Sequence, residues 1–361
     1  MKEPLCFLQS GFFFLRTAEG QGILANFAMA VLHGTEISHM AIIDKDIEKA
    51  AALLLQNQVV AIPTETVYGL AGNALNEEAV SRIYQVKNRP ATNPLIMHIK
   101  GKEEIDTYAH DVPQVIYDLA DRFWPGPLTV LLPKRSVVPD TTTSGSDKVA
   151  LRMPGHPLTL ELLKSLPFPL AAPSANPFGY ISPTRPEHVQ QQIGERIEMI
   201  LDGGACESGV ESTIVGVEGD TVLIYRLGYI TADDIKRVLP EGYQVALNTD
   251  SKPVAPGMLP YHYSPNTPLF LFDDIAEVRN KLTNDRTGLI RFSHATAGHQ
   301  PQVVLSQKGD LKEAARKLYA SLIDLDDRKL AAIYCERFPE TGLGHTLNER
   351  LQKASSKKPD S

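Results

Sequence analysis

Short apolar runs alternate with amphipathic segments from residue 40 onward, and this alternation predicts an α/β protein. Residues 59–62 form an apolar run before Pro63, which predicts a buried strand ending at a turn. Asn76 predicts the N-terminus of a helix, and residues 94–99 predict a second strand. Polar side chains gather at the ends of this strand–helix–strand unit. Open α/β sheets bind their ligands at such strand ends.

The same periodicity assigns elements to the rest of the first 245 residues. Residues 47–56 are rich in Ala and Leu and predict a helix capped by Asp44 or Asp46. Residues 136–147 are rich in Thr, Ser and Gly and predict a loop. The other predicted helices are 102–109, 115–123, 157–166 and 231–239, and the other predicted strands are 128–132, 149–153, 170–172, 199–201, 212–217 and 222–227.

Changes in composition divide the chain into five segments. Residues 1–39 predict a poorly ordered extension, because their apolar patch is short and interrupted. A signal peptide is the alternative, because Lys2 precedes this apolar patch. Residues 40–245 predict the first domain, and the Pro-rich residues 246–267 predict a semi-rigid linker. Residues 268–355 predict a smaller domain, and residues 356–361 predict a fraying tail.

The smaller domain has the sequence pattern of a βαβ, Rossmann-like fold with a parallel sheet. It has no Gly-rich dinucleotide fingerprint. Its predicted strands lie near 269–272, 288–292 and 331–334, and its predicted helices lie near 275–283, 310–325 and 345–354.

Charge and cysteine content exclude several classes of protein. The 361 residues carry a net charge of −7, which argues against a protein that coats nucleic acid. Residues 41–250 hold 18 basic and 27 acidic side chains, so an anion site there must be a local basic cluster. The three cysteines are isolated, the histidines lack metal-ligand spacing, and no apolar run has the length of a membrane span. A reducing cytoplasm is therefore the expected compartment.

Two groups of basic side chains are candidates for anion binding. Lys87 and Arg89 follow one another at the end of a predicted helix, with Asn93 close behind. They either complement the helix dipole or form a phosphate clamp. Arg152 lies within a short apolar strand, where a buried cation needs a carboxylate, from the protein or from a ligand.

Small and hydroxylated residues follow other predicted strands. Residues 172–176 would let a ligand approach the backbone closely, and Ser182 and Thr184 add hydroxyl groups. Residues 211–213 follow a Gly-rich turn and begin a strand with polar side chains. Each group is also typical of an ordinary strand–loop transition. His262 and Tyr263 lie in the linker, where packing between domains is the common role. The chain has no GxxxxGK[ST] loop, no GxGxxG after a strand and no GxSxG elbow.

Taken together and in order, these motifs resemble the YrdC-like domain family. The linker and the last predicted helix resemble the longer, two-domain form of the threonylcarbamoyl-AMP synthase family, and the resemblance spans residues 40–355. The motifs are PTETVYGL (63–70), KNRP (87–90), NPLIMHI (93–99), WPGPLT (124–129), VALRMP (149–154), AAPSAN (171–176), SPT (182–184) and GVEST (209–213), followed by APGMLPYHYSP (255–265) and RFPETGLGHTLNERLQKAS (337–355).

This resemblance implies a fold and a reaction. The fold is a twisted mixed sheet around a large concave cavity, with a smaller Rossmann-like domain after it. L-threonine, bicarbonate or carbon dioxide, and ATP as a substrate give threonylcarbamoyl-adenylate and pyrophosphate. A downstream complex then transfers the threonylcarbamoyl group to the tRNA adenosine beside the anticodon. Mg²⁺ is expected to be held mainly by the phosphates, with no metal site on the protein.

The resemblance also implies roles for individual residues. Lys148 stands where relatives often carry a Thr, which leaves its ATP contact open. The matching positions are Lys87 and Arg89 for catalysis; Thr66, His98, Arg152, Ala172 and Ser212 for L-threonine; Arg89, Asn93, Lys148, Ser174, Ser182 and Arg226 for ATP; and His262 and Tyr263 for a lid.

Two other functions remain as alternatives. One is an RNA-binding YrdC-like module without adenylate synthesis, with weak tRNA binding; the acidic balance of residues 41–250 counts against it. The other is carbamoyl transfer of the hydrogenase-maturation type. That class carries zinc-finger and acylphosphatase-like segments, which this sequence does not show.

Overall fold

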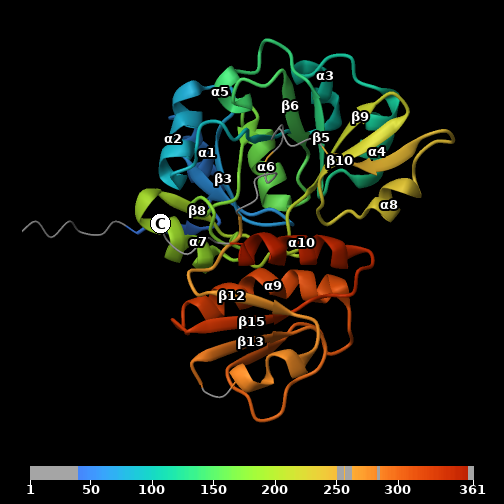
Figure 1. Cartoon of the computed structure of the whole chain (residues 1–361). Coiled ribbons are helices and arrows are strands. Elements are labelled where there is room, and N and C mark those ends of the chain that lie inside the picture. Colours follow the sequence, from blue (N-terminus) through green and yellow to red (C-terminus); the bar gives the residue numbers. More distant parts are fainter. Residues whose placement is uncertain (1–39, 250–255, 257–261, 283–284, 357–361) are drawn as a thin grey trace, which may run out of the picture. The chain divides into compact units, whose positions relative to one another are not determined.

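Two β-sheets organise the described part of the chain, which is residues 40–249, 256, 262–282 and 285–356 of a computed structural model (Figure 1). The predicted extension 1–39 and most of the predicted tail lie outside the described residues. The larger sheet is mixed. Its strands, in spatial order, are β1 (Ile42–Asp44), β8 (Met199–Leu201), β2 (Val60–Ile62), β3 (Gly69–Asn73), β7 (Leu170–Ala171), β4 (Ile96–His98), β6 (Lys148–Arg152), β5 (Leu128–Pro133), β9 (Thr213–Glu218), β10 (Thr221–Arg226) and β11 (Gln244–Leu247).

Helices cover the larger sheet, and two hydrophobic clusters lie on its two faces. Val60 and Ile62 belong to one cluster and Ala61 to the other, as the period-two geometry of a strand requires. A strand that is buried on both faces reads as a continuous apolar run. The helices are α1 (Ile47–Leu55), α2 (Glu77–Lys87), α3 (Ile105–Tyr108), α4 (Gln114–Phe123), α5 (Asp140–Thr143), α6 (Pro157–Ser165), α7 (Pro186–Ile193) and α8 (Ala232–Lys236).

Helix boundaries follow local capping chemistry. The Asp46 side chain accepts a hydrogen bond from the Lys49 amide at 2.9 Å, so Asp46, of the two predicted candidates, caps α1. Asn76 caps α2 in the same way, and Asn88 ends α2 in the left-handed region with φ of 51°. Helix α2 thus ends within the basic segment, between Lys87 and Arg89.

The smaller sheet is entirely parallel, as predicted, with the order β12–β15–β13–β14. Two long helices, α9 and α10, lie side by side over this sheet in Figure 1. Their hydrophobic cluster also includes Val67, Val210 and Tyr263 from earlier in the chain. The elements are β12 (Leu269–Phe272), β13 (Thr287–Arg291), β14 (Gln302–Val304), α9 (Leu311–Asp326), β15 (Ala332–Glu336) and α10 (Leu343–Ser355).

The structure differs from the predicted elements in several places. Strands β1, β3 and β14 and helix α7 are additional, and the predicted loop 136–147 contains the short helix α5. The predicted helix 275–283 is replaced by two 3₁₀ turns, Ile275–Glu277 and Arg279–Lys281. Strand β11 pairs with β10 and extends to Leu247, two residues into the predicted linker.

The two sheets and their helices form one compact unit. The domain boundaries at residues 245 and 268 therefore stay a prediction. In the described part of the chain, no helix has the combined length and apolar character needed to cross a membrane.

Candidate active site

A cavity lies where central strands of the larger sheet end. Its walls are formed by the segments after β2 and β7, by residues of β4, β6 and β10, by the residues before β9 and by parts of the linker. Its lining residues are Thr66, Val67, Arg89, Ile96, His98, Arg152, Ala172, Pro173, Ser174, Glu211, Ser212, Arg226, Pro256, His262 and Tyr263.

The cavity is nearly closed. Its volume is about 50 Å³, which is room for a few water molecules. Pockets that hold small organic ligands measure several hundred Å³. Any ligand of that size therefore requires the walls to move apart, and Pro256, His262 and Tyr263 form the wall that does not belong to the sheet.

Arg152 is buried and meets a carboxylate of the protein. Its Nη2 donates to Glu65 Oε1 at 2.5 Å and to Thr66 Oγ1 at 3.1 Å, and its Nε donates to the Gly126 carbonyl at 3.2 Å. Glu65 also accepts from the Gly155 amide at 2.8 Å. Of the two predicted partners for Arg152, the structure thus contains the protein carboxylate, and Glu65 was not among the predicted site residues.

His98 lies beside Arg152, because β4 and β6 are parallel and these two residues are register partners. It is almost fully buried, and neither imidazole nitrogen has a hydrogen-bond partner among the described residues. Burial, and then the charge of Arg152, lower the pKa of His98 to about 3. The imidazole is therefore neutral at physiological pH, with one donor and one acceptor nitrogen.

The buried neutral His98 should make folding stability depend on pH. Between pH 6.5 and about 3, the unfolded chain binds a proton that the folded protein excludes, so the free energy of unfolding falls as the pH falls. The slope from this one group is about 1.4 kcal/mol per pH unit inside that window. We expect urea unfolding at pH 6, 5 and 4 to show a shallower dependence for His98→Asn than for the wild type.

A variant of the exposed His294, His294→Asn, is the matched control for this measurement. Equal pH dependence in the wild type and in His98→Asn would contradict the neutral, buried state of His98.

Ser212 and Arg226 form a second polar wall. Arg226 Nε and Nη2 donate to the Ser212 carbonyl at 3.0 and 2.9 Å, and Nη2 also donates to Ser212 Oγ at 2.9 Å. The Ser212 and Thr129 hydroxyl oxygens are 2.8 Å apart. The guanidinium is therefore fixed at the end of β10 before any ligand binds.

Arg89 is the third arginine of the cavity. Its Nε donates to the Asn93 carbonyl at 3.2 Å and its Nη2 donates to the Pro94 carbonyl at 3.0 Å. Burial lowers the pKa of Arg89 to about 10, so its guanidinium stays charged at neutral pH. Arg89, Arg152 and Arg226 together give a strongly acidic protein a local cationic site.

Lys87 lies behind the cavity wall rather than in its lining. Its buried ammonium donates to the carbonyls of Ser174 at 2.5 Å and Asn176 at 2.6 Å. Burial, followed by repulsion from Arg89, lowers the pKa of Lys87. Lys87 therefore holds the small-residue loop that includes Ser174, and its predicted catalytic role stays a prediction.

Three other predicted ATP residues also lie outside the lining. Asn93 contributes its carbonyl to Arg89, and its side-chain Nδ2 has no hydrogen-bond partner in the described structure. Ser182 is fully buried and donates to Glu211 Oε1 at 2.8 Å. Lys148 begins β6, at the opposite end from Arg152, and its ammonium lies 5.8 Å from the centre of the Tyr225 ring.

Glu211 is a lining residue of the candidate group 211–213 for which the sequence predicted no role of its own. It is buried, and its Oε2 accepts from Tyr319 OH at 3.0 Å and from Arg350 Nε at 2.9 Å. Burial alone would raise the pKa of Glu211, but Arg350 and Arg226 outweigh burial and lower it to about 2. The carboxylate is thus ionised within the cavity wall.

The two predicted lid residues line the cavity from the linker. Burial strongly lowers the pKa of His262, and its ring centre lies 6.1 Å from that of Phe178. The Tyr263 ring stacks on Tyr319 at 5.6 Å, and the Arg350 guanidinium lies 5.0 Å from its centre. Neighbouring residues 257–261, which also belong to the predicted lid, lie outside the described residues.

The cavity offers no ready-made site for a metal ion. No group of three or more His, Cys, Asp or Glu side chains with suitable geometry occurs in the part of the chain that the structure describes. Glu65 and Glu211 are both engaged by arginines. These residues do not fit a protein-held metal, so no chemical step is assigned to one.

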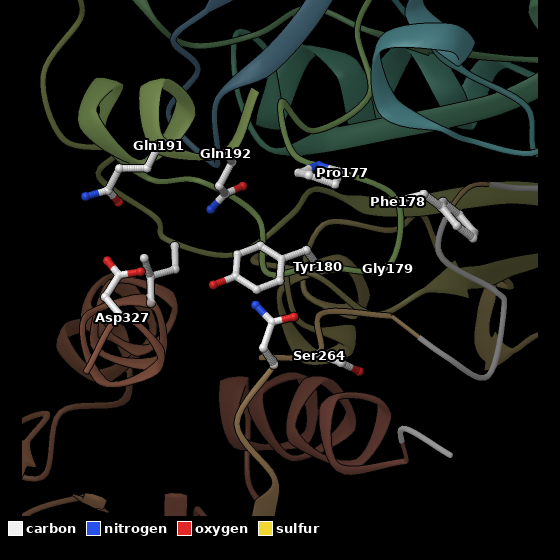
Figure 2. A pocket seen from close by; sticks show the side chains of 10 residues that line it. Pro177, Phe178, Gly179, Tyr180, Gln191, Gln192, Ser264 and Asp327 are labelled. Carbon is white, nitrogen blue, oxygen red and sulfur yellow. The ribbon is translucent and has the colours of Figure 1, made fainter. Parts of the chain in front are cut away.

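A second and larger cavity, of about 510 Å³, lies beside α7 and α9 (Figure 2). Figure 2 shows Tyr180 in the middle of its lining, with Gln191 and Gln192 on the α7 side and Asp327 on the α9 side. Among the described residues, its lining includes a carboxylate but no lysine or arginine. It therefore cannot balance the charge of a nucleotide triphosphate, and the smaller cationic cavity is the better candidate.

Comparisons with known proteins match both parts of the chain. A family model described as "Telomere recombination" matches residues 52–228, and one described as "Threonylcarbamoyl-AMP synthase, C-terminal domain" matches residues 230–356. A threonylcarbamoyl-AMP synthase from Bacillus subtilis is 39% identical over 86% of this chain and 93% of its own length. One from Pyrococcus abyssi is 38% identical over 85% of this chain and 93% of its own length.

Solved structures agree with these relatives. A crystal structure of Sua5 from P. abyssi, complexed with L-threonine, has a TM-score of 0.79 and 36% sequence identity, and covers 87% of this chain and 96% of that one. A second structure is a variant of the same protein in which a His and a Tyr are replaced by Ala; it also has a TM-score of 0.79.

Proposed function

Because this chain belongs to the threonylcarbamoyl-AMP synthase family, in its two-domain form, we propose that the cationic cavity makes threonylcarbamoyl-adenylate. L-threonine, bicarbonate or carbon dioxide, and ATP are the substrates, and pyrophosphate is the second product. The observation that carries the proposal is the convergence of Arg89, Arg152 and Arg226 on one buried cavity beside the neutral His98.

Threonine occupies the Arg152 side of the cavity. The carboxylate of the amino acid pairs with the Arg152 guanidinium, whose fork matches its geometry. Thr66, His98, Ala172 and Ser212 surround the rest of the amino acid. The binding of L-threonine by the P. abyssi Sua5 structure supports this part of the proposal.

ATP occupies the Arg89 and Arg226 side. Ser174 lines this side, whereas Lys87 acts through the loop that it holds, and Asn93 and Ser182 act from behind the wall. Lys148 lies at the far end of β6, so we assign no ATP contact to it. Mg²⁺ bound to the phosphates would add positive charge there.

The chemistry needs positioning more than a protein nucleophile. The amine of threonine takes up carbon dioxide and loses a proton to give a carbamate, and a carbamate oxygen attacks the α-phosphorus of ATP. The α–β phosphoanhydride bond breaks and pyrophosphate leaves. Fixed guanidinium groups stabilise the charge on the phosphates, and the fixed geometry lowers the entropic cost of the reaction. His262 and Tyr263 cover the substrates and exclude water from the labile carbamate.

The product then passes to a downstream complex that transfers the threonylcarbamoyl group to tRNA. The cytoplasm is the compartment that fits this step. The acidic balance of residues 41–250 makes direct tRNA binding weak at most.

Mass spectrometry of the reaction products tests the proposed function. The full chain, incubated with ATP, L-threonine and ¹³C-bicarbonate, should form a labelled threonylcarbamoyl-adenylate together with pyrophosphate. Omission of threonine, or its replacement by L-valine, is the control. Pyrophosphate release that does not depend on threonine and bicarbonate would contradict the proposal.

A further inference from the structure

Helix α10 reaches the cavity wall through the fully buried side chain of Arg350. Its Nε donates to Glu211 Oε2 at 2.9 Å, and its Nη2 donates to the Leu227 carbonyl at 2.5 Å. Its Nη1 donates to Glu349 on the same helix, and its guanidinium covers the Tyr263 ring. One side chain of the smaller domain thus contacts a carboxylate of the cavity lining, the aromatic ring of Tyr263 and the backbone directly after β10.

The bond to Glu211 sets the charge of the cavity wall. Glu211 precedes Ser212, whose carbonyl accepts hydrogen bonds from Arg226, and Arg226 lies on the side assigned to ATP. A buried carboxylate without a cation would repel the triphosphate and would compete with it for Arg226. Arg350 cancels that charge, and hydrogen bonds from Tyr319 and Ser182 complete the carboxylate's partners.

Helix α10 also fixes the strand that carries Arg226. Leu227 and Gly228 follow Arg226 directly, and the Thr346 hydroxyl donates to the Gly228 carbonyl at 3.0 Å. Gly228 packs so closely on the segment before β9 that a Cβ there would lie 2.3 Å from the Thr213 amide nitrogen. The end of β10 is therefore held between that segment and α10.

We propose that Arg350 is a positioning residue for ATP. It neutralises Glu211 and fixes the end of β10, so that the guanidinium of Arg226 remains available to the triphosphate. This inference rests on the proposed function, because it assigns the ATP side of the same cavity. Through this residue, the smaller domain contributes to nucleotide binding by way of Glu211 and the end of β10.

The test measures KM for ATP and for threonine separately, in the pyrophosphate-release assay with the full chain. Arg350→Met should raise the KM for ATP at least tenfold and change the KM for threonine less than threefold. In the double variant Arg350→Met with Glu211→Gln, both charges are absent, and the KM for ATP should return to within about threefold of the wild-type value.

Arg316→Met is the matched control. Arg316 lies on α9 and donates to the Glu207 carbonyl at 2.9 Å, so it joins the two parts of the chain away from the cavity. Its KM values should equal those of the wild type. Thermal unfolding of every variant separates a loss of ATP binding from a loss of fold.

Several outcomes would overturn the inference. They are an unchanged KM for ATP in Arg350→Met, an equal rise in both KM values, or a defect that the added Glu211→Gln change does not relieve. If Arg350→Met does not fold, Tyr319→Phe replaces it in the test. Loss of the Tyr319 hydroxyl, which donates to Glu211, should raise the KM for ATP two- to fivefold. An unchanged KM for ATP in that variant overturns the inference. A wild-type protein without threonine-dependent activity would instead overturn the proposed function.

Discussion

Arg89→Ala should reduce the rate of threonine- and bicarbonate-dependent pyrophosphate release on the order of 10³-fold or more. Removal of an arginine from a phosphoryl-transfer site has an effect in this range. Arg89 lines the cavity, and the carbonyls of Asn93 and Pro94 hold two of its nitrogens. The guanidinium is thus oriented before ATP binds, which makes its charge effective in the transition state. Initial rates at saturating ATP and threonine measure the effect.

The control for this prediction lies on the preceding helix. Arg82 is partly exposed on α2 and pairs with Glu78, so Arg82→Ala removes an arginine without touching the cavity. Its rate should stay within about twofold of wild type. A near-normal rate in Arg89→Ala, with a folded protein, would remove Arg89 from the phosphate site.

Arg152→Ala should raise the KM for threonine on the order of 10²-fold, because loss of one partner from a buried charge pair costs about 2–5 kcal/mol. The KM for ATP should change by less than about threefold. In the absence of ligand, Arg152 already pairs with Glu65. In the variant, Glu65 remains as an unpaired carboxylate beside the threonine site and adds repulsion. The additional change Glu65→Gln should therefore recover part of the threonine affinity.

Steady-state kinetics with each substrate varied in turn distinguishes this outcome from a general defect. Equal increases in the two KM values would contradict the assignment of Arg152 to threonine. Arg152→Lys keeps the charge but loses the fork, so its KM for threonine should lie between those of the wild type and Arg152→Ala.

Local signals in the sequence predicted much of the larger sheet. The apolar run ending in Ile62 and the N-cap Asn76 act within a few residues, so β2 and α2 were predicted close to their true positions. Strand β3 was missed because Gly69–Asn73 contains two Gly, an Ala and an Asn, which have low strand propensity. It forms because β2 and β7 supply partners on both sides.

The candidate site was predictable only where its chemistry lies in one residue. Arg152 was identified because a charge in an apolar strand needs a partner, but nothing local indicated that Glu65 is that partner. The sequence predicted no role for Glu211, for a stronger reason. Its partners Tyr319 and Arg350 lie 108 and 139 residues further along the chain, and only the fold brings them together.

The bond between Glu211 and Arg350 also determines the order of events when this chain folds. Contacts between residues far apart in sequence form late, because closing a long loop is entropically costly. The larger sheet is therefore expected to assemble around Glu211 before α10 docks and brings Arg350 to that carboxylate. Docking of α10 completes the cavity wall, so maturation of the cavity should be a late phase of refolding.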